Sequence, residues 1–329
     1  MADATNNTEL ESEFLPYVKV YKNGHVERLM GAESSPAGTD PQTGVVSKDV
    51  KDIIPETEVY VRIYLPKLSS TNQKLPIVVY FHGGAFILFT PSTAHYHNYL
   101  NVLAAETQVI AVSVHYRRAP EHPLPIAYED SWAAFQWVVS HSNGDGPEVT
   151  LNQHADFQHL FLYGDSAGAN IVHNLAIAAG KVEAGLNVGI LGIVLVDPYF
   201  GGTDVIGSEG DDPDGKAFAK RLWPWVCPSC PSCDDPWINP VAEGGASLAR
   251  LGCSRVQIFV AEKDVLKSRG KLYFEVLGKS GWMGIVGIHE AEGQSHVFHL
   301  FDLDGEKAKE RMRKMAAFFN RDALPPMLG

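Results

Sequence analysis

The sequence predicts an α/β fold in which helices cover both faces of a mostly parallel central sheet. Apolar strand-like segments alternate along the 329 residues with segments whose apolar residues recur at helical intervals. The pentapeptide Gly164-Asp165-Ser166-Ala167-Gly168 stands between one such strand, Leu160 to Tyr163, and a helix, Ala169 to Ala179. Active sites in sheets of this kind lie at the carboxyl ends of the strands, so functional residues are expected directly after each strand.

The other strands are predicted from their apolar patterns. Val59 to Leu65 alternates in the manner of an edge strand, whereas Pro76 to Phe81 and Val109 to Tyr116 are continuous apolar runs typical of buried parallel strands. Two further strands are expected at Gly189 to Val196 and Val256 to Ala261.

Three further helices are predicted from apolar residues at helical spacing. The apolar stripe of Ala127 to His141 indicates core packing more than contact with a cofactor. Arg269 to Lys279 and Gly305 to Phe319 have the pattern of amphipathic helices.

Two regions, residues 1–55 and 200–248, do not fit the alternation. The first is polar with scattered Gly and Pro, and the second is rich in Gly, Pro, Asp and Cys but contains several tryptophans. Segments inserted in this way commonly cover an active site. We therefore expect a single domain, residues 1–329, in which both regions are cap elements.

Composition and charge exclude several classes of function. A net charge of −12 argues against nucleic-acid binding and disfavours anionic membrane surfaces. No apolar run is long enough to span a membrane, and Met1 to Phe14 has neither the basic nor the apolar part of a secretory signal. We expect a cytoplasmic monomer or homodimer whose partner is a small molecule.

Cys227, Cys230, Cys233 and Cys253 allow three interpretations. They could hold a metal, form a disulfide or redox-sensitive loop, or be incidental thiols in a turn-rich segment. Zinc sites usually pair two separated C-x-x-C motifs, and this chain has one overlapping cluster. Incidental thiols are therefore favoured, and neither a metal nor a cofactor is expected.

Ser166 is the predicted nucleophile, because a G-x-S-x-G turn between strand and helix exposes a serine hydroxyl. A serine needs a histidine base and an acid that orients it, and in this fold they follow in the order serine, acid, histidine. Asp264 follows the strand that ends at Ala261 and is favoured as the acid over Glu262.

His296 lies in a polar loop before the final helix and is the predicted base. His299 is the competing histidine, but it falls among apolar residues, where a structural histidine is the more usual interpretation.

Oxyanion stabilisation is assigned to the glycine-rich segment after Phe81. Backbone N–H groups of Gly83, Gly84 and Ala85 are expected to act with that of Ala167, the residue after the nucleophile. His82 is expected to brace this loop.

Residues near the ends of two strands are candidates for the substrate pocket. Phe86 and Ile87 extend from the oxyanion loop, and Tyr199 and Phe200 end another strand, so an apolar to aromatic acyl pocket is plausible beside plain core packing. Asp197 is expected near the pocket, where it favours a polar or basic group of the substrate.

Three motifs together resemble plant carboxylesterases of the hormone-sensitive-lipase-like branch of the α/β-hydrolases. They are His82-Gly83-Gly84-Ala85-Phe86, Tyr116-Arg117-Arg118-Ala119-Pro120-Glu121 and Gly164-Asp165-Ser166-Ala167-Gly168-Ala169-Asn170. The resemblance implies an α/β-hydrolase fold, a triad of Ser166, Asp264 and His296, and an N-terminal segment that helps to cap the acyl pocket. Ala85 departs from the third glycine usual in the family, and Arg118 from a leucine.

The favoured function is a serine carboxylesterase that hydrolyses small or medium esters of plant metabolites through an acyl-enzyme. A dehydratase or other lyase, or a cyclase, of plant specialised metabolism is the alternative, with His296 as general base. The related 2-hydroxyisoflavanone dehydratases also carry alanine at position 85 but typically have threonine where Ser166 stands. A non-catalytic hormone receptor is less favoured, because the related receptors lack the catalytic histidine.

Overall fold

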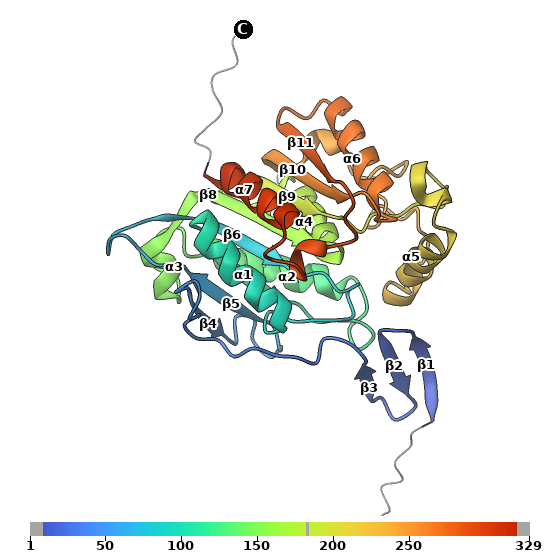
Figure 1. Ribbon diagram of the computed structural model, residues 1–329, viewed down its shortest axis with the longest axis horizontal. Coiled ribbons are helices and arrows are strands. Elements are labelled where there is room, and N and C mark those ends of the chain that lie inside the picture. Colours follow the sequence, from blue (N-terminus) through green and yellow to red (C-terminus); the bar gives the residue numbers. More distant parts are fainter. Residues whose placement is uncertain (1–8, 182–183, 321–329) are drawn as a thin grey trace, which may run out of the picture.

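The computed structural model describes residues 9–181 and 184–320. The chain ends, 1–8 and 321–329, lie outside the described residues, and so does part of the segment in which no secretory signal is expected. The centre of the fold is an eight-stranded sheet (Figure 1), in the order β11-β10-β9-β8-β6-β7-β5-β4. Its strands are β4 (Val46–Val50), β5 (Tyr60–Leu65), β6 (Leu75–Phe81), β7 (Ile110–His115), β8 (Ala155–Asp165), β9 (Ile190–Val196), β10 (Cys253–Ala261) and β11 (Ile285–Ala291).

Neighbouring strands from β7 to β11 pair in parallel, and β5 and β4 add antiparallel pairs at one edge. The sequence prediction of a mostly parallel sheet is therefore confirmed. Because all the strands from β6 to β11 run in the same direction, the loops after β6, β8, β9, β10 and β11 leave the sheet at one edge.

Helices cover both faces of the sheet. On one face lie α1 (Ala94–Thr107) and α7 (Glu306–Phe319), which contact one another. On the other lie α2 (Ile126–Val139), α4 (Ala167–Ala179) and α6 (Lys267–Lys279). Successive side chains of a strand point to opposite faces of the sheet. Val78 therefore packs in the cluster under α1, and Val79 in the cluster under α4.

Several elements depart from the sequence prediction. The segment Val46–Val50, expected within a cap, is instead the edge strand β4 of the main sheet. Helix α1 was not predicted, nor was the short helix α3 (Val149–His154) before β8. The insertion at 200–248 contains α5 (Pro213–Val226), which begins at a proline as helices often do, after the capping carboxylate of Asp212.

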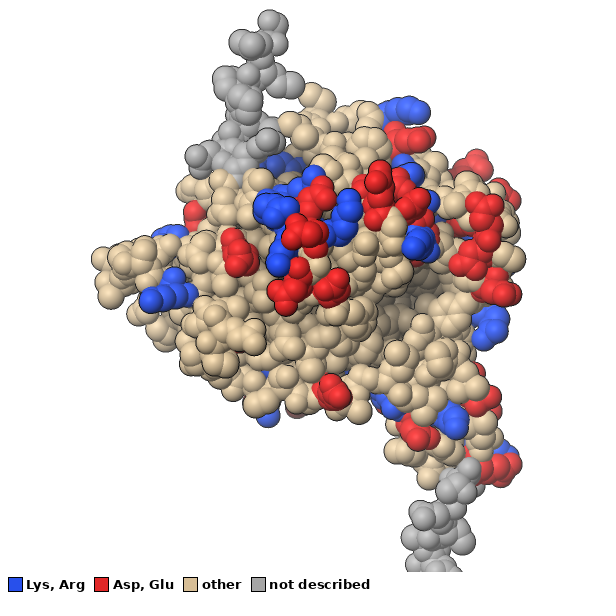
Figure 2. Space-filling model, viewed as in Figure 1, with Lys and Arg blue, Asp and Glu red and all other residues tan. Residues whose placement is uncertain are grey.

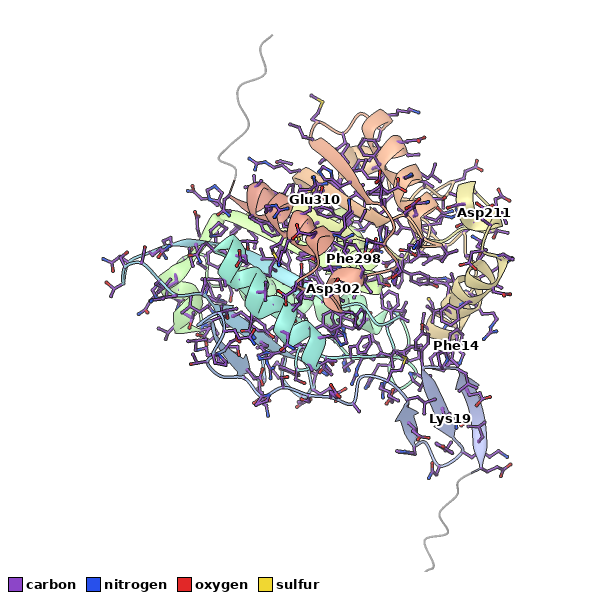
Figure 3. All side chains as sticks on the ribbon, viewed as in Figure 1. Phe14, Lys19, Asp211, Phe298, Asp302 and Glu310 are labelled. Atoms are coloured by element: carbon purple, nitrogen blue, oxygen red, sulfur yellow. The ribbon has the colours of Figure 1, made fainter. Side chains whose placement is uncertain are left out.

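The N-terminal residues form a small antiparallel sheet, β1 (Leu10–Phe14), β2 (Val18–Tyr21) and β3 (Val26–Arg28), which stands beside α5 in Figure 1. Aromatic rings join these two distant segments. Phe14 and Tyr17 lie edge-on to Phe218 with ring centroids 5.2 and 5.4 Å apart, and Phe14 also meets Trp225 at 5.6 Å. Figure 3 labels Phe14 at this junction.

No helix among the described residues is long and apolar enough to cross a membrane. On the face drawn in Figure 2, acidic and basic side chains gather over the upper right part of the molecule, and the lower left part is largely uncharged. The same view shows a hollow between the main body and the lobe formed by β1–β3.

Candidate active site

Ser166 occupies a tight turn between the end of β8 and the start of α4. Its backbone has φ 52° and ψ −118°, a strained conformation for a residue with a side chain. The flanking glycines permit the turn, because a Cβ atom at Gly168 would lie 1.9 Å from the Phe81 carbonyl oxygen. At Gly164 a Cβ would lie 2.4 Å from the Gly168 carbonyl. Strand β6 and helix α4 thus approach one another closely. The tight turn between β8 and α4 places the Ser166 hydroxyl at the edge of the sheet.

The structure brings Ser166, His296 and Asp264 together from three separate loops. The Ser166 Oγ lies 3.0 Å from His296 Nε2, and His296 Nδ1 lies 2.7 Å from Asp264 Oδ2. The other carboxylate oxygen of Asp264 accepts a 3.0 Å hydrogen bond from the Leu266 N–H, which fixes the carboxylate at the start of α6. When the imidazole is neutral, its Nδ1–H donates a hydrogen bond to Asp264, and its Nε2 accepts one from the Ser166 hydroxyl.

Negative charge surrounds the His296 imidazole. Burial lowers its pKa, but the charge and hydrogen bond of Asp264 outweigh burial, and Asp197 and Asp165 act in the same direction. Together they raise the pKa of His296 to about 9. This arrangement stabilises the protonated, imidazolium form of His296.

The two rival residues lie elsewhere. Glu262 is exposed and accepts a 2.6 Å hydrogen bond from the Gly293 N–H, so it holds the loop before His296. His299 is buried, with Nδ1 2.9 Å from Arg311 and its ring 5.0 Å from that of Tyr99. Burial, together with Arg311, holds the pKa of His299 well below its usual value. Neither residue reaches Ser166.

Asp197 lies near the site, with a carboxylate oxygen within 4.8 Å of an atom of His296, but it does not line the cavity at Ser166. It is buried behind His296, where it accepts a 2.9 Å hydrogen bond from the Val297 N–H and lies 3.7 Å from the Arg311 guanidinium. Burial is the main cause of the raised pKa of Asp197. Its contacts stay inside the protein, where they fix the loop that carries His296.

Asp165 is a site residue that sequence reasoning missed. Its buried carboxylate accepts hydrogen bonds from the hydroxyls of Tyr80 and, at 2.8 Å, Tyr96, and from the Gly83 N–H at 3.2 Å. A Cβ at Gly83 would lie 2.4 Å from this carboxylate. An acidic residue beside the nucleophile, at the end of a buried strand, was the available signal.

These contacts correct part of the predicted oxyanion hole. The Gly83 N–H donates to Tyr96 and Asp165, so it is directed into the protein and not toward a substrate. Among the described residues, the N–H groups of Gly84, Ala85 and Ala167 have no acceptor. Gly84 and Ala85 also line the cavity at Ser166. These three N–H groups remain candidates for oxyanion donors.

His82 packs under the same loop. Its ring stacks on Tyr116 with centroids 4.4 Å apart, its Nδ1 lies 2.8 Å from the Gly83 carbonyl, and the Tyr116 hydroxyl donates to its backbone carbonyl at 2.7 Å. Burial holds the pKa of His82 well below its usual value, so it is a neutral brace.

Arginines tie the segment after the oxyanion loop to its surroundings. Arg118, which stands where the resembled family usually has a leucine, donates a 2.9 Å hydrogen bond to the Phe89 carbonyl. Arg28 donates to the Ile87 carbonyl at 2.7 Å and forms a two-pronged pair with Glu121, at 2.9 and 2.7 Å. The unusual arginine therefore has a structural role at the base of this loop.

A cavity of about 460 Å³ opens over Ser166 and His296. Both regions expected to form a cap contribute to its wall, the first through Tyr17 and Met30 and the second mainly through α5. The apolar residues on the side of α5 and α6 are Tyr199, Phe218, Ala219, Leu222, Val265 and Leu266.

Of the predicted pocket residues, Tyr199 lines this cavity, whereas Phe86, Ile87 and Phe200 do not. Ala85 and Phe86 both have φ 60°, and this turn buries the side chains of Phe86 and Ile87 in the core while Leu88 reaches the cavity. Phe200 packs against His173 at 5.5 Å. The expectation for these three residues is therefore wrong, and plain core packing is the correct interpretation.

The four cysteines are free thiols. Within the described ranges, the only group of three potential metal ligands with donor atoms within 4.8 Å is Asp197, Asp264 and His296, and the cysteines form no such group. Within that group Asp264 is hydrogen-bonded to His296, and His296 in turn to Ser166.

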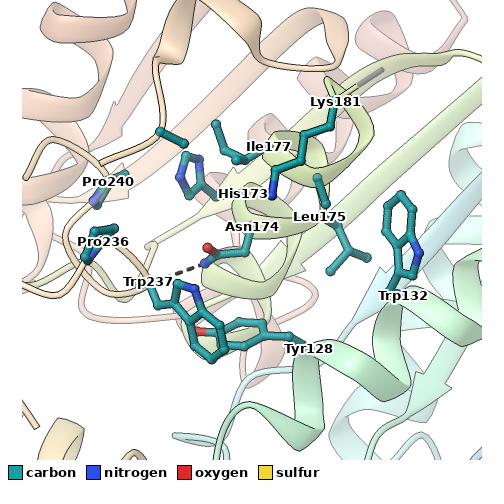
Figure 4. A pocket seen from close by; sticks show the side chains of 12 residues that line it. Tyr128, Trp132, His173, Asn174, Leu175, Ile177, Lys181, Pro236, Trp237 and Pro240 are labelled. Atoms are coloured by element: carbon teal, nitrogen blue, oxygen red, sulfur yellow. Dashed lines mark hydrogen bonds between the residues drawn. The ribbon is translucent and has the colours of Figure 1, made fainter. Parts of the chain in front are cut away.

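A second cavity of about 280 Å³ lies between α2, α4 and the insertion, and Figure 4 shows it. Asn174 donates there to the Trp237 carbonyl at 3.1 Å. It has no lining residue in common with the cavity at Ser166, so it is a separate feature.

Comparison with known proteins agrees with this geometry. A family described as "alpha/beta hydrolase fold" matches residues 78–300, and a family described as "Carboxylesterase family" matches residues 31–121. A solved esterase from Pyrobaculum calidifontis superposes with a TM-score of 0.70 at 25% identity, covering 83% of this chain and 84% of that one.

Three plant proteins are similar over almost the whole chain. "Probable carboxylesterase 2" of Arabidopsis thaliana is 48% identical, covering 95% of this chain and 97% of the relative. "Tuliposide A-converting enzyme 1, chloroplastic" of Tulipa gesneriana is 45% identical over 94% of this chain and 78% of its own length. "2-hydroxyisoflavanone dehydratase" of Glycine max is 42% identical, with shares of 94% and 98%.

Proposed function

Because the chain belongs to the α/β-hydrolase fold family, we propose that it is a serine carboxylesterase acting on small or medium esters of plant metabolites. The observation that carries this proposal is the continuous line of hydrogen-bonding atoms from Ser166 Oγ through the His296 imidazole to Asp264. The carboxylesterase relatives and the Pyrobaculum esterase support the reaction class.

Acylation begins when Ser166 Oγ attacks the ester carbonyl carbon and its proton passes to His296 Nε2. The carbonyl oxygen becomes an oxyanion that accepts hydrogen bonds from the N–H groups of Gly84, Ala85 and Ala167. Removal of one such donor typically raises the barrier by about 2.7–4 kcal/mol. The alcohol leaves with the proton from Nε2, and the acyl group remains on Ser166.

Deacylation repeats these steps with water. His296 takes a proton from the water, the resulting hydroxide attacks the acyl carbon, and the carboxylic acid leaves as Ser166 regains its proton. Asp264 keeps the imidazole in the orientation that both halves of the cycle need.

Incubation with p-nitrophenyl acetate and butyrate tests this proposal. The native protein is expected to release p-nitrophenol from both esters, and Ser166→Ala to lose nearly all turnover while its circular dichroism is unchanged. Turnover that survives Ser166→Ala would overturn the acyl-enzyme mechanism.

Elimination of water from a specialised metabolite is the second candidate, because a dehydratase is among the close relatives. His296 would then remove a proton from carbon and deliver it to the departing hydroxyl, which leaves as water, and Ser166 would only position the substrate. Elimination activity that persists in Ser166→Ala would support this candidate over hydrolysis.

A cytoplasmic location is proposed with this function, and the tulip relative named chloroplastic makes the plastid the alternative. A fluorescent fusion of the full chain distinguishes the two. The proposed partner is the small-molecule ester alone, with a monomer or homodimer as the acting species.

A further inference from the structure

A hollow larger than the cavity at Ser166 lies beside it. Its volume is about 760 Å³, and it lies where the segment after β3, the N-terminal end of α1 and the loop after His296 meet. Five residues line both spaces, namely Met30, Phe89, His95, Leu300 and Phe301. Because these five residues line both, the two spaces adjoin, and we name the larger one the outer basin.

Three large apolar side chains on the wall of the outer basin are exposed to water. Leu29, Met30 and Phe301 are 40%, 45% and 68% exposed, and all three line it. Large apolar side chains that gather at one exposed place indicate a binding surface. The basin thus presents the apolar area that a ligand group could bury.

Aromatic rings stand where the two spaces meet. The His95 ring lies edge-on to Phe89 at 4.7 Å, and 5.1 Å from that of Phe301. The His95 Nε2 is buried and has no hydrogen-bond partner among the described residues. Ring edges and faces favour a flat aromatic group.

The order of the chain assigns the outer basin to one half of an ester. During acylation the leaving alcohol oxygen must lie beside His296 Nε2, because it receives the proton from there. From His296 the chain runs through Leu300 and Phe301 directly into the wall of the basin. The acyl group is then left with the remaining apolar wall of the cavity at Ser166, which α5 and the end of β9 form.

Charge limits what the basin accepts. Its lining includes Glu33, Asp302 and Asp304, and the described residues contribute no lysine or arginine to it. Asp302, labelled in Figure 3, lies in the loop between His296 and α7, and Lys309 approaches only Asp304, at 3.9 Å. A negatively charged alcohol group would meet repulsion here without a cation to offset it.

We propose that the outer basin binds the alcohol part of the substrate, and that this part is a bulky aromatic group without negative charge. The proposal rests on the esterase function proposed above. It names the half of the ester that determines specificity.

The test compares acetate esters that have the same acyl group. With the native protein, kcat/KM for benzyl acetate is expected to exceed that for ethyl acetate by roughly tenfold or more, since burying a ring contributes more than burying a methyl group. Phe301→Ala and Met30→Ala are expected to reduce this ratio severalfold. Met283→Ala is the matched control, because Met283 is 86% exposed and lines neither space.

A parallel series of ethyl esters from acetate to hexanoate distinguishes the two halves of the substrate. The outer-basin variants are expected to leave the dependence on acyl length as in the native protein. A change in acyl dependence instead of alcohol dependence would overturn the assignment. Phe301 and Met30 are exposed, so their replacement removes little core packing, and circular dichroism checks the fold.

The charge expectation has its own measurement. 4-Carboxybenzyl acetate is expected to be a poorer substrate than benzyl acetate, and Asp302→Asn or added salt should reduce the difference. Equal rates for both esters would contradict this part. If no ester is hydrolysed, the proposed function fails, whereas hydrolysis that ignores the alcohol group overturns only the outer-basin proposal.

Discussion

The carboxylate of Asp197 accepts a 2.9 Å hydrogen bond from the backbone N–H of Val297, the residue that follows His296 in the chain. Val297 has φ 46°, a left-handed conformation that β-branched residues rarely adopt. Asp197 therefore supports a strained residue next to the proposed base. Its charge also helps to raise the pKa of His296.

Asp197→Asn separates these two effects. The amide oxygen can still accept the Val297 N–H, but the negative charge is lost, so the pKa of His296 is expected to fall. The acidic limb of the plot of kcat/KM against pH should then move to lower pH while KM changes little. An unmoved limb would show that Asp197 does not act on His296 through its charge.

Asp197→Ala removes the acceptor as well and leaves Arg311 buried without its carboxylate. Loss of one partner from a buried pair costs about 3–5 kcal/mol of the free energy of unfolding. Chemical denaturation is expected to show a loss of this order for Asp197→Ala and a smaller one for Asp197→Asn.

The pH dependence of the native protein follows from the pKa of His296, which is about 9. Only the neutral imidazole accepts the Ser166 proton, so kcat/KM should rise with pH and level off near that value. A plateau beginning near 6.5, the ordinary pKa of histidine, would contradict the influence of the surrounding carboxylates.

Stability should change in the opposite sense. Since folding raises the pKa of His296, its contribution is fully present below about pH 6.5 and is lost as the pH rises through about 9. Asp264→Asn should lower the pKa of His296 and reduce kcat by on the order of 10³–10⁴. Denaturation curves measured between pH 6 and 9.5 on both proteins check the stability effect.

Gly83→Ala tests the support of the oxyanion loop. The added methyl group would lie 2.4 Å from the Asp165 carboxylate and 3.0 Å from the Tyr96 hydroxyl, so the loop must shift. A displacement that weakens one oxyanion donor should lower kcat by about 10²-fold or more. Gly38→Ala is the control, because a Cβ there meets nothing within 4 Å. Equal activity of the two variants would rule out this role for the loop.

Phe14→Ala tests whether the N-terminal sheet acts as a cap. Phe14 is 3% exposed and its ring contacts both Phe218 and Trp225 of α5. Its removal should loosen the wall of the cavity and raise KM severalfold with a smaller change in kcat. Leu10→Ala, at a residue of the same sheet that is 42% exposed, should leave KM unchanged. If both variants match the native protein, the cap interpretation is wrong.

The sequence predicted the parts of the fold that have strong local patterns. Buried parallel strands are continuous apolar runs, so β6 and β7 were found with small errors at their ends. Helix α1 was missed because histidines and asparagines interrupt its buried tyrosines. The exposed edge strand β11 was missed because its side chains are at best half-buried and impose little pattern.

The site residues, like the elements of the fold, could be predicted only where a local pattern marks them. Ser166 and Asp264 could be proposed because each follows a predicted strand, and His296 because it lies in a polar loop before the final helix and the fold restricts the order of the three. Phe86 and Ile87 could not be placed, because two successive positive φ angles reverse the loop and bury them. The role of Asp197 depends on a contact across 100 residues that no local pattern contains.

The most direct test of the acyl-enzyme on Ser166 is rapid quenching during turnover of p-nitrophenyl butyrate, followed by intact-protein and peptide mass spectrometry. The account predicts a butyryl adduct on the peptide that contains Ser166, which accumulates in Asp264→Asn if deacylation is slowed and is absent in Ser166→Ala. Turnover without an adduct, or an adduct confined to another residue, would contradict it.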